Sequence, residues 1–339
     1  VTHSRGGLVA EVLARAAANP ELKDEDVSAL AAPEQRDLKA LASLLGDKQV
    51  RVERVVRVAC PARGTLLASK RLDAYLSVFK WTLELGGVPV LPEFVDFLSA
   101  VAQRRADPEQ LPGLAAQIPG SALVQWLHAA DAALPGQLRV VAGDVQGDSV
   151  GSWLKTLLAD SFYWTDNDFV VQTRSMYGGA PRAGGALFLL DRGAKIAHNS
   201  YLAAERTAEA VCNALTQNEP AGFAVIGPLS WAGEDSSGTR GGSTTGTRGP
   251  EDTRPASDKP AVILLPGICG SHLAVGGKRI WLGFRVINGL KRLAYPDAKD
   301  VTADGAIGPI YDDLAEHLRA THEVIEFSYD WRRPLEEEA

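Results

Sequence analysis

The chain has 339 residues, of which 45% are hydrophobic and 23% are charged. These values are ordinary for a globular protein and exclude a wholly disordered or collagen-like chain. Its 35 Lys and Arg against 42 Asp and Glu give a net charge of −7, so the composition argues against a nucleic-acid-binding protein. No apolar run approaches the roughly 20 residues that a membrane-spanning helix needs.

The three cysteines, Cys60, Cys212 and Cys269, are far apart in the sequence. Their odd number and wide spacing predict neither a disulfide framework nor a zinc site. A chain with few, widely spaced cysteines fits a reducing compartment, which slightly favours the cytoplasm. Because the chain opens on Val1 without a basic and then apolar leader, we expect its ends to be cuts in a longer protein.

The first residues carry the clearest chemical signal. Residues 1–7 (VTHSRGG) lead directly into residues 8–15 (LVAEVLAR), which have a helical pattern. A serine between a strand and a helix, hemmed in by small residues, is typical of a nucleophile elbow. Ser4 is therefore the candidate nucleophile, and the backbone N–H of Arg5, at the positive end of the helix, is a candidate oxyanion donor. Thr2 replaces the usual glycine, and a loop that merely caps the helix is the alternative.

The chain up to residue 217 is predicted to be α/β. Apolar runs that end in turn residues predict strands, and an Ala- and Leu-rich stretch predicts a helix. The predicted strands are 52–60, 138–142, 169–171 and 186–190, and the predicted helix is 201–215. Residues from about 66 to 136 are helical in pattern, interrupted by prolines, and unusually long for a connector. We interpret this section as a helical cap over an apolar site, with a plain helical layer as an equal alternative.

A reactive serine needs a histidine base and an acid that orients the histidine. In α/β-hydrolases these parts follow in the order Ser, acid, His. Asp168 is the preferred acid, with Asp144 next and Asp166 also competing, and His198 is the preferred base. For His198 the alternative is a polar residue at a helix start.

Two other histidines are weaker candidates for the base. His3 adjoins Ser4 on the opposite side of the elbow, and His128 is expected to be a surface or cap histidine.

Composition changes sharply after the first portion. Residues 233–249 (GEDSSGTRGGSTTGTRG) contain no apolar side chain that could build a core. We therefore predict a flexible linker over 218–258.

The chain after the linker resumes an α/β pattern. The apolar run 261–265 (AVILL) is followed by Pro266 and Gly267, which predicts a strand buried on both faces of a parallel sheet. A helix is predicted at 311–319 and a strand at 322–327. One strand–helix–strand unit is too little for a whole domain, so 259–339 begins a fold that it does not finish.

Several of these strings together resemble α/β-hydrolase lipases of the lecithin–cholesterol acyltransferase-like group. THSRGGLV at 2–9 is similar to the family's elbow, and ACPARGT at 59–65 to its "TPhxGT" string. NDFVV at 167–171 is similar to its acid segment, often "GDGVV", with Asn and Phe replacing glycines. VILLPGICGSHL at 262–273 resembles the opening strand and oxyanion loop, and FSYDWR at 327–332 the "YDWR" string that precedes the elbow.

The resemblance implies an α/β-hydrolase-type sheet, mostly parallel, with helices on both faces and a cap insertion. It gives residues 1–217 as the C-terminal portion of one hydrolase and 259–339 as the N-terminal portion of a second or permuted one. Either the chain is a slice of a tandem protein, which we favour, or it is a circular permutant. The family expects a helix and a central strand between "YDWR" and the elbow, and without them neighbouring strands would be left with unpaired backbone groups.

The resemblance also implies a serine hydrolase or acyltransferase that acts on small-molecule or lipid esters without metal or organic cofactor. Ser4 would attack, His198 would carry the proton, and Asp168 would orient His198. The N–H of Ile268 would be the second oxyanion donor, although in a tandem slice it would serve a different serine. Cys269 is expected to be a small buried residue and not a nucleophile. The alternative function is a catalytically inactive scaffold or recognition module.

Overall fold

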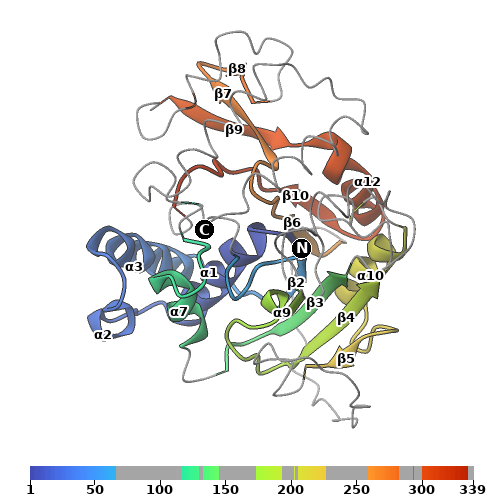
Figure 1. The fold of residues 1–339 in the computed structure, drawn as a ribbon, viewed down its shortest axis with the longest axis horizontal. Coiled ribbons are helices and arrows are strands. Elements are labelled where there is room, and N and C mark those ends of the chain that lie inside the picture. Colours follow the sequence, from blue (N-terminus) through green and yellow to red (C-terminus); the bar gives the residue numbers. More distant parts are fainter. Residues whose placement is uncertain are drawn as a thin grey trace, which may run out of the picture.

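The computed structural model describes residues 1–65, 113, 116–129, 133–144, 173–192, 202, 205–226, 259–281, 293 and 300–334. The described residues form a mixed α/β structure around a mostly parallel sheet (Figure 1). In Figure 1, α1 (Gly6–Ala18), α3 (Ala32–Asp47) and α7 (Ala122–His128) lie on one side of the strands, and α10 (Glu205–Thr216) and α12 (Gly308–Arg319) lie on the other. Two single-turn helices are α2 (Asp24–Val27) and α9 (Thr173–Met176).

The central sheet takes strands from both ends of the chain. Five strands are hydrogen-bonded in the order β1-β2-β3-β4-β5, and β10 pairs with β6. All these pairs are parallel except β4 with β5. The bounds are β1 Thr2–His3, β2 Arg54–Val58, β3 Gln137–Asp144, β4 Ala186–Arg192, β5 Ala224–Val225, β6 Ala261–Leu264 and β10 Glu323–Glu326.

The two strand groups meet at the N-terminal segment. The Val1 amino group donates to the Ile263 carbonyl at 2.8 Å, and Leu265 N–H donates to the Val1 carbonyl at 2.9 Å. His3 N–H then donates to the Leu265 carbonyl at 3.0 Å, and Thr2 and Leu265 form a parallel bridge. The first residues therefore occupy the place between β6 and β2, and they satisfy backbone groups that we expected to be unpaired.

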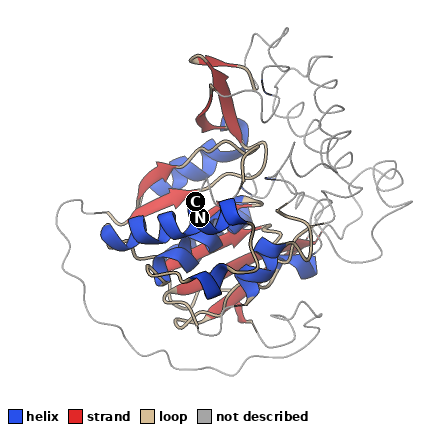
Figure 2. Ribbon diagram, turned by 90° about the vertical axis from the view of Figure 1, so that its left-hand side faces the viewer, coloured by secondary structure: helices blue, strands red, loops and turns tan. Residues whose placement is uncertain are grey.

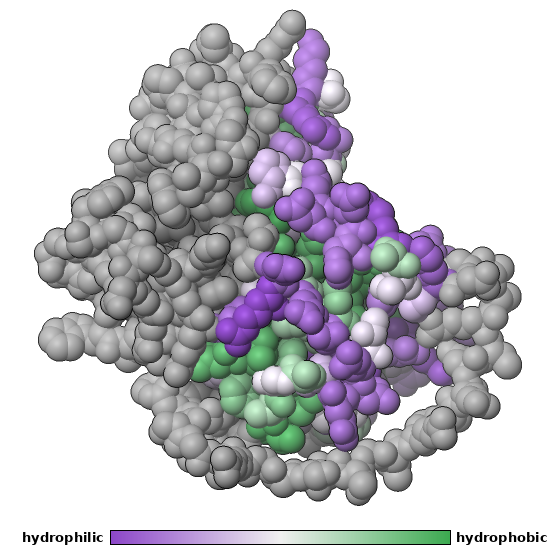
Figure 3. All heavy atoms as spheres, turned by 90° about the vertical axis from the view of Figure 1, so that its right-hand side faces the viewer, coloured by the Kyte–Doolittle hydropathy of each residue, from purple (hydrophilic) through white to green (hydrophobic). Residues whose placement is uncertain are grey.

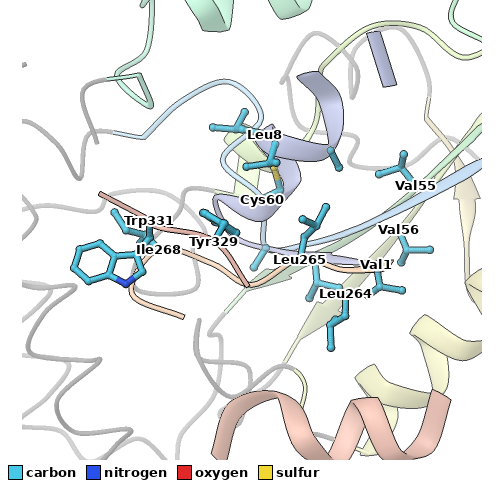
Figure 4. Close-up of a cluster of buried hydrophobic side chains, with 14 of the residues drawn as sticks. Val1, Leu8, Val55, Val56, Cys60, Leu264, Leu265, Ile268, Tyr329 and Trp331 are labelled. Atoms are coloured by element: carbon cyan, nitrogen blue, oxygen red, sulfur yellow. The ribbon is translucent and has the colours of Figure 1, made fainter. Parts of the chain in front are cut away.

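One apolar core includes residues of both portions. Leu8, Val56 and Cys60 belong to the same buried cluster as Leu264 and Tyr329. Figure 4 shows these side chains coming from α1, from β2 and the residues after it, from β6 and from the segment after β10. The N- and C-terminal portions of this chain therefore pack as parts of one sheet and one core.

A smaller antiparallel sheet follows β6. It consists of β7 (Ser271–Val275) between β8 (Lys278–Arg279) and β9 (Val301–Ala306). Trp281, which is fully buried, donates from its indole N–H to the Cys269 carbonyl at 3.0 Å. This contact anchors the hairpin to the loop that follows β6.

The expected strands at 52–60, 138–142, 186–190, 261–265 and 322–327 correspond to β2, β3, β4, β6 and β10. One detail of the β6 prediction is wrong, because burial alternates along the strand and the Ile263 side chain is 40% exposed. Its register partner Ile325 is 45% exposed on β10, so this part of the parallel sheet is covered on one face.

Some other expectations concern residues outside those that the structure describes. The expected strand 169–171 lies outside them, as does most of the expected cap at 66–136. Within the expected linker 218–258, Ala224 and Val225 form β5 against β4, so ordered structure extends further than we predicted. The helix expected at 201–215 is described from Glu205 onwards as α10.

Helices α10 and α12 present hydrophilic side chains outward. Figure 3 views the molecule from their side and shows a broad hydrophilic area over the described residues. Their inner faces carry Val211 and Leu314, both fully buried. Figure 2, from the opposite side, shows helices lying in front of the strands. No described helix is long and apolar enough to span a bilayer.

A buried ion-pair group holds the elbow helix to the sheet. Glu11 on α1 accepts from Arg57 Nη1 on β2 at 3.0 Å and from Arg182 Nη2 at 2.7 Å. All three side chains are at most 2% exposed. Arg57 Nη2 also donates to the Gly178 carbonyl at 2.8 Å. One carboxylate thus balances two buried cations beneath the helix that follows Ser4.

We predict that Glu11→Gln lowers the free energy of unfolding by about 3–5 kcal/mol, because it leaves two buried guanidinium groups without their counter-charge. Urea unfolding followed by circular dichroism would measure the loss. Glu25, whose side chain is 78% exposed, supplies the control: Glu25→Gln should stay within about 0.5 kcal/mol of the wild type. Equal midpoints for the two variants would contradict the prediction.

Candidate active site

Ser4 lies on a sharp turn between β1 and α1. Its φ angle is 51°, in the left-handed region that non-glycine residues adopt at a cost of about 1–3 kcal/mol. The Ser4 N–H donates to the Val58 carbonyl at 2.9 Å, and the Ser4 carbonyl accepts from Gly7 N–H at 3.0 Å. Strand pairing on one side and the first helical turn on the other thus hold the strained conformation.

The two glycines after Arg5 are required by close packing. A Cβ atom on Gly6 would lie 2.5 Å from the carbonyl oxygens of Leu265 and Pro266, and one on Gly7 would lie 2.3 Å from Cys60 Sγ. The turn between β1 and α1 therefore fits tightly against the end of β6 and the end of β2. Thr2 also fits, because its hydroxyl donates to the Val56 carbonyl at 3.3 Å.

The loop after β6 lies directly against the serine. A Cβ atom on Gly267 would be 2.9 Å from Ser4 Cβ, so a glycine is needed for this approach. Ile268 follows Gly267 and is 8% exposed. The structure therefore brings Ser4, Arg5 and the segment of Ile268 together, although they come from opposite ends of the chain.

Tyr311 on α12 positions this loop, a role that the sequence analysis did not assign. Its hydroxyl accepts from Gly267 N–H at 2.9 Å and lies 2.9 Å from His3 Nδ1. This one hydroxyl therefore joins the Gly267 loop to the residue that precedes Ser4. Burial raises the pKa of Tyr311, so the hydroxyl keeps its proton.

Tyr329 supports the same loop from the C-terminal segment. Its hydroxyl donates to the Pro266 carbonyl at 2.8 Å, and the Arg5 guanidinium carbon lies 5.2 Å from the centre of its ring. The string at 327–332 was recognised in the sequence, but no signal there linked Tyr329 to the loop. Long-range contacts of this kind depend on the fold and not on local pattern.

The expected acid and base lie outside the described residues. Asp168 and His198 are therefore placed only through their flanks: α9 begins five residues after Asp168, and β4 ends six residues before His198. Asp144, the alternative acid, is the last residue of β3. The parallel strands β1, β3 and β4 end at the same edge of the sheet, which is the edge where Ser4 lies.

The comparisons with known proteins give one family match. Residues 32–216 match the model described as "Domain of unknown function (DUF7379)", which is more than half of the 339 residues. The chain belongs to this family. The matched region includes α3 to α10 and the positions of Asp168 and His198, and it excludes Ser4 and Ile268. Neither the curated proteins nor the solved structures contain a match.

The cysteines near the elbow are not suited to nucleophilic chemistry. Burial raises the pKa of the Cys60 thiol to about 12 and also raises that of Cys269. Cys269 is 3% exposed, which confirms the prediction of a small buried residue. Within the described ranges, no group of three or more His, Cys, Asp or Glu side chains could hold a metal ion.

His128 is held by hydrogen bonds at both ring nitrogens. It ends α7 and is half-buried; its Nδ1 lies 2.7 Å from the Val124 carbonyl and its Nε2 accepts from Gly179 N–H at 3.0 Å. These bonds fix the ring between α7 and the loop after α9, and the expectation of a surface or cap histidine stays a prediction. Burial lowers the pKa of His128.

We predict that the stabilising contribution of His128 to the fold is lost in mild acid. A folded-state pKa below the unfolded value means that the unfolded chain binds the extra proton first, so stability falls as the pH drops below about 6.5. The difference in unfolding free energy between wild type and His128→Gln should shrink from pH 8 to pH 5. A difference that is constant over this range would contradict the prediction.

We also predict that Tyr311→Phe destabilises the protein by about 1–3 kcal/mol, because it strands the buried N–H of Gly267. Tyr329→Phe is the matched variant: it removes the same atom but strands a carbonyl, which tolerates the loss of a partner better. Urea unfolding should therefore give a lower free energy of unfolding for Tyr311→Phe than for Tyr329→Phe. The reverse order would show that the Tyr311 hydroxyl does not hold the loop.

Proposed function

We propose that this chain is a serine hydrolase that acts on carboxylic esters and is related to the α/β-hydrolase lipases. The observation that carries the proposal is the strained Ser4, with φ 51°, between β1 and the start of α1. Strain of this kind in a non-glycine residue is kept where function requires it. The tight glycine contacts behind it are those that a nucleophile elbow needs.

The spatial order of strands supports the same proposal. Reading across the sheet, the order is β10, β6, β1, β2, β3, β4. The elbow follows a central strand, the loop with Ile268 follows its neighbour β6, and the segment leading to His198 follows β4. A catalytic serine, an oxyanion loop and a base that come from neighbouring strand ends can meet at one edge.

The proposed mechanism uses side chains and backbone groups of this chain. Ser4 Oγ attacks the ester carbonyl while His198 accepts its proton, and Asp168 orients and stabilises the charged imidazole. The N–H groups of Arg5 and Ile268 stabilise the oxyanion. His198 then protonates the leaving alcohol, and water, or an acceptor alcohol in an acyltransferase, releases the acyl group from Ser4.

The backbone N–H of Arg5 is available for this role. It lies at the start of α1, where the helix dipole is positive, and no backbone acceptor for it is found among the described residues. The N–H of Gly267 is bonded to Tyr311, and the family resemblance assigns the second oxyanion donor to the next residue, Ile268. The proposal treats both portions of this chain as one catalytic unit.

The second candidate is a catalytically inactive hydrolase-like scaffold. The observation in its favour is that Ser4 is 4% exposed, which leaves little of this residue open to a substrate. Thr2 gives no support to this alternative, since its side chain is accommodated by the Val56 carbonyl.

An active-site-directed fluorophosphonate probe distinguishes the two. We expect the wild-type chain to be labelled at Ser4, Ser4→Ala to lose labelling, and the exposed control Ser28→Ala to keep it. Asp168→Ala and His198→Ala should each lower kcat for p-nitrophenyl butyrate by about 10⁴-fold or more. Absence of labelling in the folded wild-type chain would support the scaffold.

A further inference from the structure

The Arg5 side chain is an unusual neighbour for the candidate nucleophile. It is fully buried, one residue after Ser4. Its Nε donates to the Gly113 carbonyl at 3.1 Å, and its Nη2 donates to the Arg333 carbonyl at 2.6 Å. The guanidinium carbon lies over the Tyr329 ring, 5.2 Å from its centre. All these contacts are with neutral groups.

The third nitrogen, Nη1, is buried and has no hydrogen-bond partner among the described residues. Nε and Nη2 form one edge of the planar fork, so Nη1 projects from the opposite corner. A buried donor without a partner costs about 1–3 kcal/mol, and more when it is charged. The structure therefore holds a buried donor in place at a cost, on the residue that follows Ser4 in the sequence.

The charge of Arg5 is also unbalanced within the described residues. Asp330, close to Arg333 in sequence, is already paired with Arg332 through bonds of 2.8 and 2.6 Å. Glu11 on α1 is shared by Arg57 and Arg182. Burying a guanidinium without a carboxylate partner is unfavourable.

A second source of positive potential lies at the same place. Arg5 is the residue that precedes α1, a helix of 13 residues, and the positive end of the helix dipole faces this region. Helix N-termini and arginine forks are the two devices by which proteins most often bind carboxylates and phosphates. Both belong to Arg5, the residue that follows Ser4 and precedes α1.

We propose that Arg5 Nη1 binds an anionic group of the ligand, so that the substrates are esters carrying a carboxylate or phosphate close to the reacting carbonyl. The substrate class rests on the proposed ester hydrolysis, whereas the anion site rests on Arg5 alone. The bound anion supplies the counter-charge that the described residues do not provide.

The first test measures binding to the full chain by calorimetry at constant ionic strength. Succinate, its neutral analogue succinamide and inorganic phosphate are the probes. We expect succinate or phosphate to bind at least tenfold more tightly than succinamide, as a charge-assisted bond predicts. The anion that binds more tightly, succinate or phosphate, indicates whether the ligand's anionic group is a carboxylate or a phosphate. Equal binding of all three probes, or no binding of either anion, would overturn the proposal.

Variants assign the binding to Arg5. Arg5→Met should weaken anion binding at least tenfold, and Arg5→Lys should retain part of it because the charge remains. Arg36→Met removes an arginine whose side chain is 75% exposed and should bind as the wild type does. Undiminished anion binding in Arg5→Met would overturn the proposal. If Arg5→Met fails to fold, Arg5→Lys and the wild-type probe comparison decide.

A kinetic measurement separates the two proposals. The ratio of kcat/KM for mono-p-nitrophenyl succinate to that for p-nitrophenyl butyrate should exceed ten in the wild type and fall at least tenfold in Arg5→Met. If Ser4 hydrolyses both esters alike and no anion binds, the anion site is wrong and the hydrolase stands. If anions bind through Arg5 but Ser4 is neither labelled nor active, the site stands and the hydrolase is wrong.

Discussion

The parallel pairing of the first three residues with β6 on one side and β2 on the other is the interaction on which the rest depends. Three backbone hydrogen bonds join Val1 and His3 to the segment 263–265, and the register of Thr2 with Arg57 joins them to β2. Without this short strand, the sheet would separate into two groups, and the loop after β6 would not reach Ser4.

The surroundings of Ser4 show how a strained turn is maintained. Each neighbour restricts the conformation of the turn. The carbonyl of Val58 accepts from the N–H of Ser4, and the N–H of Gly7 donates to the Ser4 carbonyl. The carbonyl oxygens of Leu265 and Pro266 leave no room for a side chain at Gly6. Tyr311 and Tyr329 then fix the loop on the other side. The strain is stored because contacts from distant segments all favour the same conformation.

The local sequence pattern was sufficient to locate helices and strands, but it did not show which of them lie next to each other. The apolar runs that became β2, β3 and β4 could be located because strand residues recur with turn residues after them. The sequence also indicated Ser4 and the Gly267 loop, but favoured separate folds for them, since adjacency of β1 and β6 has no local signal. Tyr311 was visible only as part of a helix, and the partial exposure of Ile263 followed from coverage of one sheet face, which a fully apolar run does not reveal. Asp168 and His198 stay predictions.

The position of β1 between β2 and β6 also bears on how the protein is made. During synthesis the ribosome releases residues 1–226 well before residues 261–265, so one edge of β1 waits for a strand that does not yet exist. Pairing across such a sequence separation is slow and leaves an edge open to other chains. In a nascent chain of this topology, that edge of β1 stays unpaired until β6 has emerged.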